Sequence, residues 1–282
     1  MGKRVIEVAS NQESLPLGLP PASRNGGRKA SSDIAPVVHE DLPGWRLRVY
    51  PEAREAGGVF RADGFDRGRK APQGAPDLER AAEEAARRAR SKVRRYCAAN
   101  RLNRLGTLTY AGEGCHDPTV FRLDMARFIR RLRGFLGEGD FPYLWVPEWH
   151  KQGHGLHGHV AVGRYINRSA IDAAWGHGFV HIKLLGDLPV GSGTLDQARV
   201  AARYLSKYLV KDMQALQGSG LHRYEVAQGF QPTSVGVHTY FLDDAIREAS
   251  ELVGGEEPAY LWRVGSDPES GKPAMAWASW RG

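Results

Sequence analysis

Cysteine is scarce in this sequence, which contains only Cys97 and Cys115 and no CxxC spacing. A disulfide framework and a cysteine-ligated zinc site are therefore not indicated, and both side chains are expected to be reduced thiols in a cytoplasmic protein. No apolar run approaches the ~18 residues that a membrane-spanning helix needs. The first four residues are not followed by an apolar segment, so no secretory signal is expected.

Acidic residues are fewer than basic ones. The chain has 32 Asp and Glu against 39 Lys and Arg, which gives a net charge of +7 over 282 residues. Such an excess indicates the kind of partner and not the fold, and nucleic acid is the commonest acidic partner. The length allows one sizeable core with tails, or two small domains.

The sequence divides into three segments by composition. Residues 1–76 are rich in Pro, Gly, Ser and Arg and predict a basic, partly flexible arm, in which only residues 45–50 alternate like a strand. Residues 77–215 carry the strongest helix and strand patterns and are predicted to form the main domain. Residues 216–282 form an extension of uncertain structure, with a helix expected over residues 243–252.

Within the main domain, the patterns predict a strand, a helix, two strands, a short helix and a strand, followed by one more helix. This order is typical of an α+β, ferredoxin-like (RRM-like) antiparallel sheet, here called the palm, with helices on one face and a C-terminal helix that carries two tyrosines. A long helix precedes it. The expected elements cover residues 77–99, 105–110, 119–136, 141–149, 156–163, 167–175, 179–185 and 195–213.

Arginines crowd the later half of the first of these helices. Six cations lie there without an interleaved acid, which is more than a helix dipole needs and favours contact with phosphates. The helix over 119–136 carries arginines beside its apolar stripe. The candidate DNA-binding residues are Arg87, Arg88, Arg94, Arg95, Arg130 and Arg131.

Two histidines alternate with glycine in the third predicted strand. Side chains two residues apart in a strand point to the same face, so His157 and His159 are expected to lie together. The preceding strand offers Glu148 and, two residues on, His150. Two imidazoles and a carboxylate can hold one Mg²⁺ or Mn²⁺, with either Glu148 or His150 as the third ligand.

Two tyrosines lie four residues apart in the last helix of the main domain. Tyr204 and Tyr208 share one face, and each is followed three residues later by a lysine, Lys207 or Lys211. A phenol is a weak nucleophile at neutral pH and needs a nearby cation and a polarised electrophile. A phosphodiester held by a metal is such an electrophile, so the two pairs together indicate formation of a phosphotyrosine. Taken alone, either pair is more often structural.

These motifs resemble those of the HUH single-strand endonucleases, and in particular the two-tyrosine rolling-circle replication initiators of plasmids and single-stranded DNA phages. The resemblance rests on the Thr-rich strand at 105–110, the His157-Gly158-His159 motif and the tyrosine helix. It implies nicking of single-stranded origin DNA, a 5′-phosphotyrosine link and a 3′-OH for a host polymerase. It also implies a divalent metal ion, Mg or Mn, bound by His157, His159 and Glu148, with Tyr204 and Tyr208 as nucleophiles. Gly158 departs from the family, which usually has a bulky apolar residue there.

Three other functions fit parts of the pattern. A two-tyrosine transposase of the same superfamily usually carries a cysteine zinc cluster, and a relaxase carries a third histidine, for which His154 is not on the expected strand face. A non-catalytic RNA-recognition module needs stacking aromatics on its sheet. Residues 265–272 have the wrong spacing for a phosphate loop and precede Pro273, so a host helicase is expected to unwind the DNA.

Overall fold

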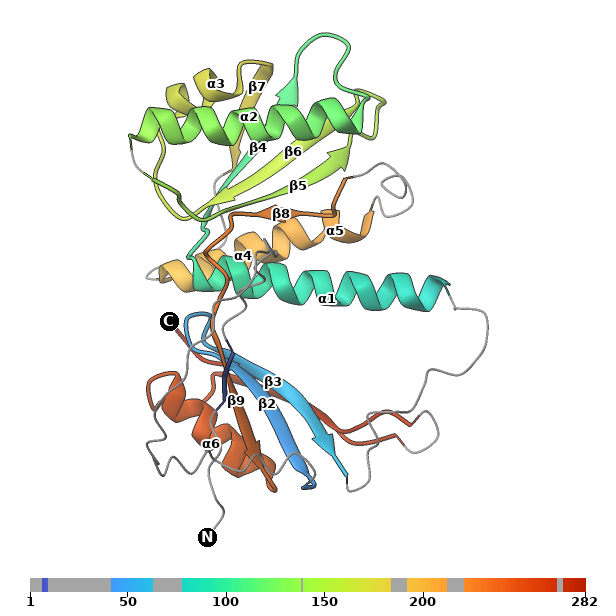
Figure 1. Ribbon diagram of the computed structural model, residues 1–282, viewed down its shortest axis with the longest axis vertical. Helices are drawn as coiled ribbons and strands as arrows, with labels where there is room; N and C mark the ends of the chain where they lie inside the picture. Colours follow the sequence, from blue (N-terminus) through green and yellow to red (C-terminus); the bar gives the residue numbers. More distant parts are fainter. Residues whose placement is uncertain are drawn as a thin grey trace, which may run out of the picture.

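The computed structural model contains two antiparallel sheets with helices between them (Figure 1). It describes residues 7–9, 42–62, 78–137, 139–183, 192–211, 221–267 and 271–282. Within these ranges, no helix combines the length and the apolar character needed to cross a membrane.

The first sheet is the predicted palm. Its strand order is β7-β4-β6-β5-β8, and the four strands β4 to β7 pair antiparallel in the arrangement of a ferredoxin-like fold. The α+β prediction is therefore confirmed. The elements are β4 (Arg104–Tyr110), α2 (Pro118–Leu136), β5 (Tyr143–Trp149), β6 (Leu156–Val162), α3 (Arg168–Trp175), β7 (Gly178–Lys183) and the short edge strand β8 (Glu225–Val226).

Both helices between the palm strands have explicit end signals. The side chain of Asp117 accepts hydrogen bonds from the first turn of α2, and the helix ends at Gly137 in the left-handed conformation that glycine tolerates best. In α3, the predicted cap Asn167 accepts a hydrogen bond from the backbone N–H of Ser169. These caps explain why both helices begin where the sequence predicted.

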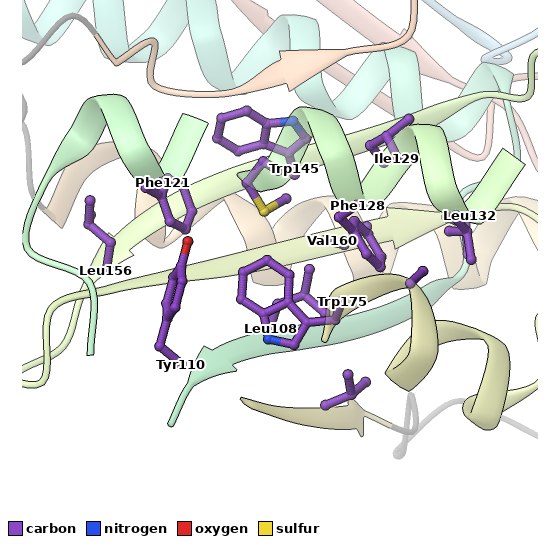
Figure 2. Packing of buried hydrophobic residues seen from close by; sticks show 14 of the residues in the cluster. Leu108, Tyr110, Phe121, Phe128, Ile129, Leu132, Trp145, Leu156, Val160 and Trp175 are labelled. Atoms are coloured by element: carbon purple, nitrogen blue, oxygen red, sulfur yellow. The ribbon is translucent and has the colours of Figure 1, made fainter. Parts of the chain in front are cut away.

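Helices α2 and α3 cover one face of the palm. Figure 2 shows the aromatic and aliphatic side chains of α2 packed over Leu108 and Val160, with Trp175 of α3 closing the cluster. Trp175 is fully buried, and its indole N–H donates to the carbonyl oxygen of Thr109. This face of the sheet therefore carries the larger part of the apolar core of the palm.

The opposite face of the palm, which carries His157 and His159 and is called the histidine face, is also covered. Helix α1 (Leu78–Ala99), helix α4 (Thr194–Ser206) and the short α5 (Tyr208–Lys211) lie against it, with α1 packed on α4 (Figure 1). Leucines and alanines of α4 and α5 meet buried residues of β4, β5 and β6 in a second core cluster. Strand β6 is consequently buried along its whole length.

The tyrosine helix differs from the prediction. The sequence predicted one helix over 195–213, whereas the structure ends α4 at Ser206 and begins α5 at Tyr208. The hydroxyl of Ser206 donates to the carbonyl oxygen of Ala202, a local bond that competes with the helical ladder and bends helices. The N–H of Lys207 then bonds to the carbonyl three residues back, at Tyr204. The interruption therefore falls between the two tyrosines.

The second sheet joins segments from both ends of the chain. Its order is β1-β9-β2-β3-β11-β10, and helix α6 (Leu242–Leu252) packs on one face over Leu47, Val49 and Ala278. Strands that the sequence analysis assigned to a basic arm and to a C-terminal extension are thus neighbours in one sheet. The strands are β1 (Glu7–Ala9), β2 (Gly44–Tyr50), β3 (Glu55–Arg61), β9 (Ser234–Thr239), β10 (Tyr260–Val264) and β11 (Met275–Ser279).

A buried carboxylate links the second sheet to α1. Glu55 of β3 is nearly inaccessible, and both of its oxygens are bound by guanidinium groups, Arg94 Nε at 2.8 Å and Arg95 Nε at 3.0 Å. The Arg95 guanidinium also lies over the ring of Tyr50, 4.3 Å from its centroid. Two of the arginines expected to contact DNA therefore make contacts inside the protein.

We expect Glu55→Ala to destabilise the protein, because it leaves two guanidinium groups without their shared acceptor. Since both arginines are partly exposed and can reach water, the expected loss is about 1–3 kcal/mol of unfolding free energy. Denaturant titration measures it. The matched control is Glu84→Ala, which removes an exposed carboxylate paired with Arg80 and Arg88 on the same helix and should cost under about 0.5 kcal/mol. Equal losses would contradict a structural role for Glu55.

Candidate functional site

The two histidines of β6 point to the same face, as the alternation predicted. Both are buried, with 8 % exposure for His157 and 5 % for His159. Gly158 between them points to the other face, where an added Cβ would lie 2.9 Å from Sδ of Met125. Met125 of α2 fills the space that a bulky apolar side chain at position 158 would take, which accounts for the glycine there.

Each imidazole is held by a threonine of the neighbouring strand β4. Thr107 lies opposite His159 in the sheet, and its Oγ1 is 3.1 Å from Nδ1 of that ring. Thr109 lies two positions further along, with Oγ1 3.4 Å from Nδ1 of His157. A hydrogen bond at Nδ1 fixes both the tautomer and the orientation of an imidazole, and it leaves Nε2 as the donor atom for a ligand. The sequence analysis assigned these threonines to a motif but not to this contact.

The two Nε2 atoms differ in their surroundings. Nε2 of His159 lies 2.6 Å from Oε2 of Glu148, so the predicted carboxylate does reach the histidine pair. Nε2 of His157 is buried and has no hydrogen-bond partner among the described residues. Burial, with smaller effects from neighbouring histidines, lowers the pKa of His157 to about 4. This ring is therefore neutral near pH 7, which is the state in which an imidazole binds a metal.

His150, the other candidate for a third ligand, lies differently. Its ring stacks on that of His157, with centroids 4.6 Å apart and an interplanar angle of 11°. Two parallel rings direct their in-plane lone pairs along parallel lines, which do not converge on one ion. This stacking favours Glu148 over His150 as the third residue beside His157 and His159. No group of three or more His, Cys, Asp or Glu side chains among the described residues is arranged to hold a metal ion.

Both tyrosines reach the histidine pair. The ring of Tyr208 stacks on that of His159, with centroids 3.9 Å apart and an interplanar angle of 15°. Its hydroxyl donates a hydrogen bond of 2.7 Å to the hydroxyl of Tyr204. Burial and this hydrogen bond raise the pKa of Tyr208. Because Tyr208 is the donor, its hydroxyl can stabilise negative charge on the phenol oxygen of Tyr204.

The cations around the tyrosines are only partly those predicted. Nζ of Lys207 lies 5.6 Å from the ring centroid of Tyr204, and Nζ of Lys183 lies closer, at 4.7 Å. Lys183 comes from β7, where it pairs with Leu105 on the histidine face. Local sequence patterns do not indicate Lys183, because its position depends on the register of a distant strand. The side chain of Lys211 lies outside the described residues.

The remaining arginines predicted to contact DNA are exposed on α1 and α2. Arg87 and Arg88 are on the first half of α1, and Arg88 Nη1 pairs with Glu84 at 3.7 Å. Arg130 and Arg131 are on α2, across the palm sheet from the histidines. The palm sheet therefore separates Arg130 and Arg131 from the histidines and tyrosines, whereas Arg87 and Arg88 lie on the helix that packs against α4 and α5.

Comparison with known protein families places the site within a matched region. Residues 103–213 match the family model of the replication-associated protein ORF2/G2P. No similar curated protein and no similar solved structure was found. The matched residues run from the start of β4 through α5 and contain the histidine pair, Glu148 and both tyrosines. The match supports a role as a replication initiator, which agrees with a DNA partner.

We expect Thr109→Ala and Thr107→Ala to release the imidazoles that they hold. Without a hydroxyl at Nδ1, His157 or His159 should populate a mixture of tautomers, which imidazole ¹⁵N chemical shifts measure directly. Each variant should also lose about 1 kcal/mol of unfolding free energy. Threonine to serine at the same positions keeps the hydroxyl and serves as the control. Tautomer populations that stay unchanged in the alanine variants would contradict the role.

We also expect a defined pH dependence of stability in EDTA. Because an unfolded histidine has a pKa near 6.5, the unfolded chain binds more protons at His157 than the folded protein does as the pH falls from about 6.5 to about 4. The free energy of unfolding should therefore fall across this window, and His157→Gln should flatten the dependence. His181→Gln, at an exposed histidine of β7, is the control. Denaturant titrations across the window decide, and an identical slope in His157→Gln would contradict the assignment.

Proposed function

We propose that this protein initiates rolling-circle replication by nicking and rejoining single-stranded origin DNA through a 5′-phosphotyrosine intermediate. The observation that carries the proposal is the pair of tyrosine hydroxyls, 2.7 Å apart, beside a buried histidine pair. The family match over residues 103–213 supports the class of process. Unwinding and synthesis are then the work of a host helicase and polymerase.

A divalent ion, Mg²⁺ or Mn²⁺, is part of the proposal. His157 and His159 would hold it, with Glu148 as the third ligand. Two observations fit the histidines as ligands: both Nδ1 atoms contact threonine hydroxyls, and Nε2 of His157 has no partner among the described residues. Glu148 would have to give up its 2.6 Å contact with Nε2 of His159 to become the third ligand, because no three such side chains among the described residues are already arranged around one ion. When bound, such an ion polarises a non-bridging oxygen of the phosphodiester.

The chain's own residues account for the nucleophile. In the nicking step, the phenol oxygen of one tyrosine bonds to phosphorus and the bond from phosphorus to the 3′ oxygen breaks. The phenol proton passes to solvent, and the 3′ oxygen leaves with the bonding electrons and takes up a proton. The hydroxyl of the second tyrosine stabilises the phenolate by the shared hydrogen bond, and Lys183 and Lys207 add positive charge beside Tyr204.

Two nucleophiles in one site suit a reaction that must both open and close a strand. After the first tyrosine has formed its covalent bond to the 5′ phosphate, the second still carries an unreacted hydroxyl beside it. Since α4 and α5 hold both rings against the histidine face, the second tyrosine can attack a new phosphodiester without a large rearrangement. This arrangement favours alternating use of Tyr204 and Tyr208 during initiation and termination.

The structure also bears on the non-catalytic alternative. An RNA-recognition module binds its ligand on an open sheet through stacked aromatic side chains. Here both faces of the palm sheet are covered, one by α2 and α3 and the other by α1, α4 and α5. This covering speaks against binding on an open sheet and favours chemistry at the tyrosines.

With Mg²⁺ or Mn²⁺ and single-stranded oligonucleotides that span the origin, the protein is expected to form a covalent adduct that survives SDS and that EDTA prevents. The double variant Tyr204→Phe, Tyr208→Phe should form none, because it lacks both nucleophiles. Each single variant retains one nucleophile and should still form an adduct. Gel mobility of labelled DNA measures the adduct. The control is Tyr224→Phe, a half-buried tyrosine that packs on the same core cluster as the pair. An adduct of undiminished yield in the double variant would contradict the mechanism.

A further inference from the structure

The register of the second sheet defines a surface on the side away from α6. Directly paired residues share a face, so Trp262 of β10, Trp277 of β11, Gly57 of β3 and Arg48 of β2 form one row across four strands. The face opposite carries the core under α6, including Leu47 and the other members of its cluster. We call the side away from α6 the outer face. Its side chains on β2, β3, β10 and β11 also include Arg46, Tyr50, Glu55, Val59, Arg61, Tyr260, Val264, Met275 and Ser279.

Aromatic rings gather at one end of the outer face. Trp262 is 42 % exposed and Tyr260 is 53 % exposed, although both belong to a strand of a six-stranded sheet. The ring of Tyr260 lies 5.6 Å from that of Trp277. Trp277 lies over strand β3, where a Cβ at Gly57 would come within 3.1 Å of its ring. The glycine therefore gives this indole room to lie across the sheet.

Positive charge borders the aromatic rings. Arg46, Arg48 and Arg61 lie on the outer face, and the guanidinium of Arg94 lies 4.9 Å from the centroid of Trp277. Among the residues of β2, β3, β10 and β11 that point to the outer face, Glu55 is the single carboxylate. Arg94 and Arg95 neutralise it. The outer face is thus cationic and aromatic with no exposed acid on these strands.

Helix α1 extends this surface. Its C-terminal half lies over the row of Glu55, whereas β3 continues away from the helix (Figure 1). Exposed Arg87 and Arg90 precede Arg94 by seven and four residues, so they lie on the same stripe of the helix. Arg94 on this stripe contacts Glu55 of β3, so the stripe is on the side of α1 toward the second sheet. The arginines of α1 therefore reach the outer face beside Trp277.

We propose that the outer face of the second sheet is a binding site for single-stranded DNA, separate from the tyrosine site, with bases stacked on Trp262 and Tyr260 and phosphates bound by Arg48 and the arginines of α1. Stacking on aromatic rings requires unpaired bases, which distinguishes a single strand from a duplex, and the cations follow the backbone. The proposal rests on the proposed function only in taking DNA as the substrate. It assigns to the second sheet the task of holding a strand that flanks the nick.

The test measures binding without cleavage. The full-length protein in EDTA is titrated with a fluorescein-labelled oligothymidylate, and fluorescence anisotropy gives the affinity at several salt concentrations. Trp262→Ala should weaken binding roughly 5- to 100-fold, since it removes one stacking platform. Arg48→Ala should make the slope of log K against log salt shallower by about 0.7 for each phosphate that the variant no longer neutralises.

The same strand offers matched controls. Leu261 and Arg263 flank Trp262, are exposed, and point to the other face of the sheet. Leu261→Ala and Arg263→Ala should leave both the affinity and the salt slope unchanged. If Trp262→Ala unfolds the protein, Arg48→Glu on β2 tests the same surface by charge reversal and should weaken binding more than Arg263→Glu does.

Two results would overturn the proposal. One is that Trp262→Ala and Arg48→Ala bind DNA like their controls. The other is that they change the sedimentation behaviour of the protein and not its DNA affinity, which would make the edge strand β10 a contact between protein chains. The covalent assay separates this proposal from the proposed function, because Trp262→Ala should still form the adduct at saturating DNA. If the wild-type protein forms no adduct, and Trp262→Ala and Arg48→Ala still weaken oligothymidylate binding, the result supports this site and contradicts the nicking mechanism.

Discussion

The burial of strand β6 on both faces is the constraint on which the site depends. Because successive side chains alternate, one face of the strand must pack under α2 and the other must meet α4 and α5. The first face takes Gly158 and Val160 against the core of α2, and the second takes His157 and His159. A shift of one residue in the register would bury the histidines under Met125 and remove them from the tyrosines. The polar site is therefore a consequence of how an apolar core is packed.

The stacking of Tyr208 on His159 connects this strand to the helical layer. Leu205 and Leu209 are buried with Val146 and Ala161 of the sheet, and this apolar contact places the ring of Tyr208 over the imidazole of His159. On either side of the interruption at Lys207, α4 contacts β4 and α5 contacts β5. Threonines of β4 contact both imidazoles, and the tyrosines contact the ring of His159. A preorganised site of this kind loses little freedom when a strand binds.

Local patterns were sufficient to predict the palm and the residues at its site. The helix caps, the strand alternation and the four-residue tyrosine spacing all depend on neighbours in sequence, so His157 could be paired with His159 and Tyr204 with Tyr208. The order of the elements and the resemblance to the HUH endonucleases then placed the two pairs at one site. Contacts set by pairing between distant strands could not be predicted. Lys183 reaches Tyr204 only through the register of β7, and Arg94 and Arg95 bind Glu55, about 40 residues earlier, because the second sheet packs under α1. That sheet pairs residues near position 47 with residues near position 237, a separation at which sequence patterns carry no signal.

The proposed mechanism requires that the tyrosines beside the histidine pair carry the covalent bond to DNA. Mass spectrometry of the trapped protein–DNA adduct after digestion by protease and nuclease tests this most directly, because it identifies the residue that bears the 5′ nucleotide. The predicted result is a nucleotide on Tyr204 or Tyr208 in the wild-type protein, moving to the remaining tyrosine in each single phenylalanine variant. A nucleotide on any other residue would contradict the account, and so would a nick that leaves no modified tyrosine.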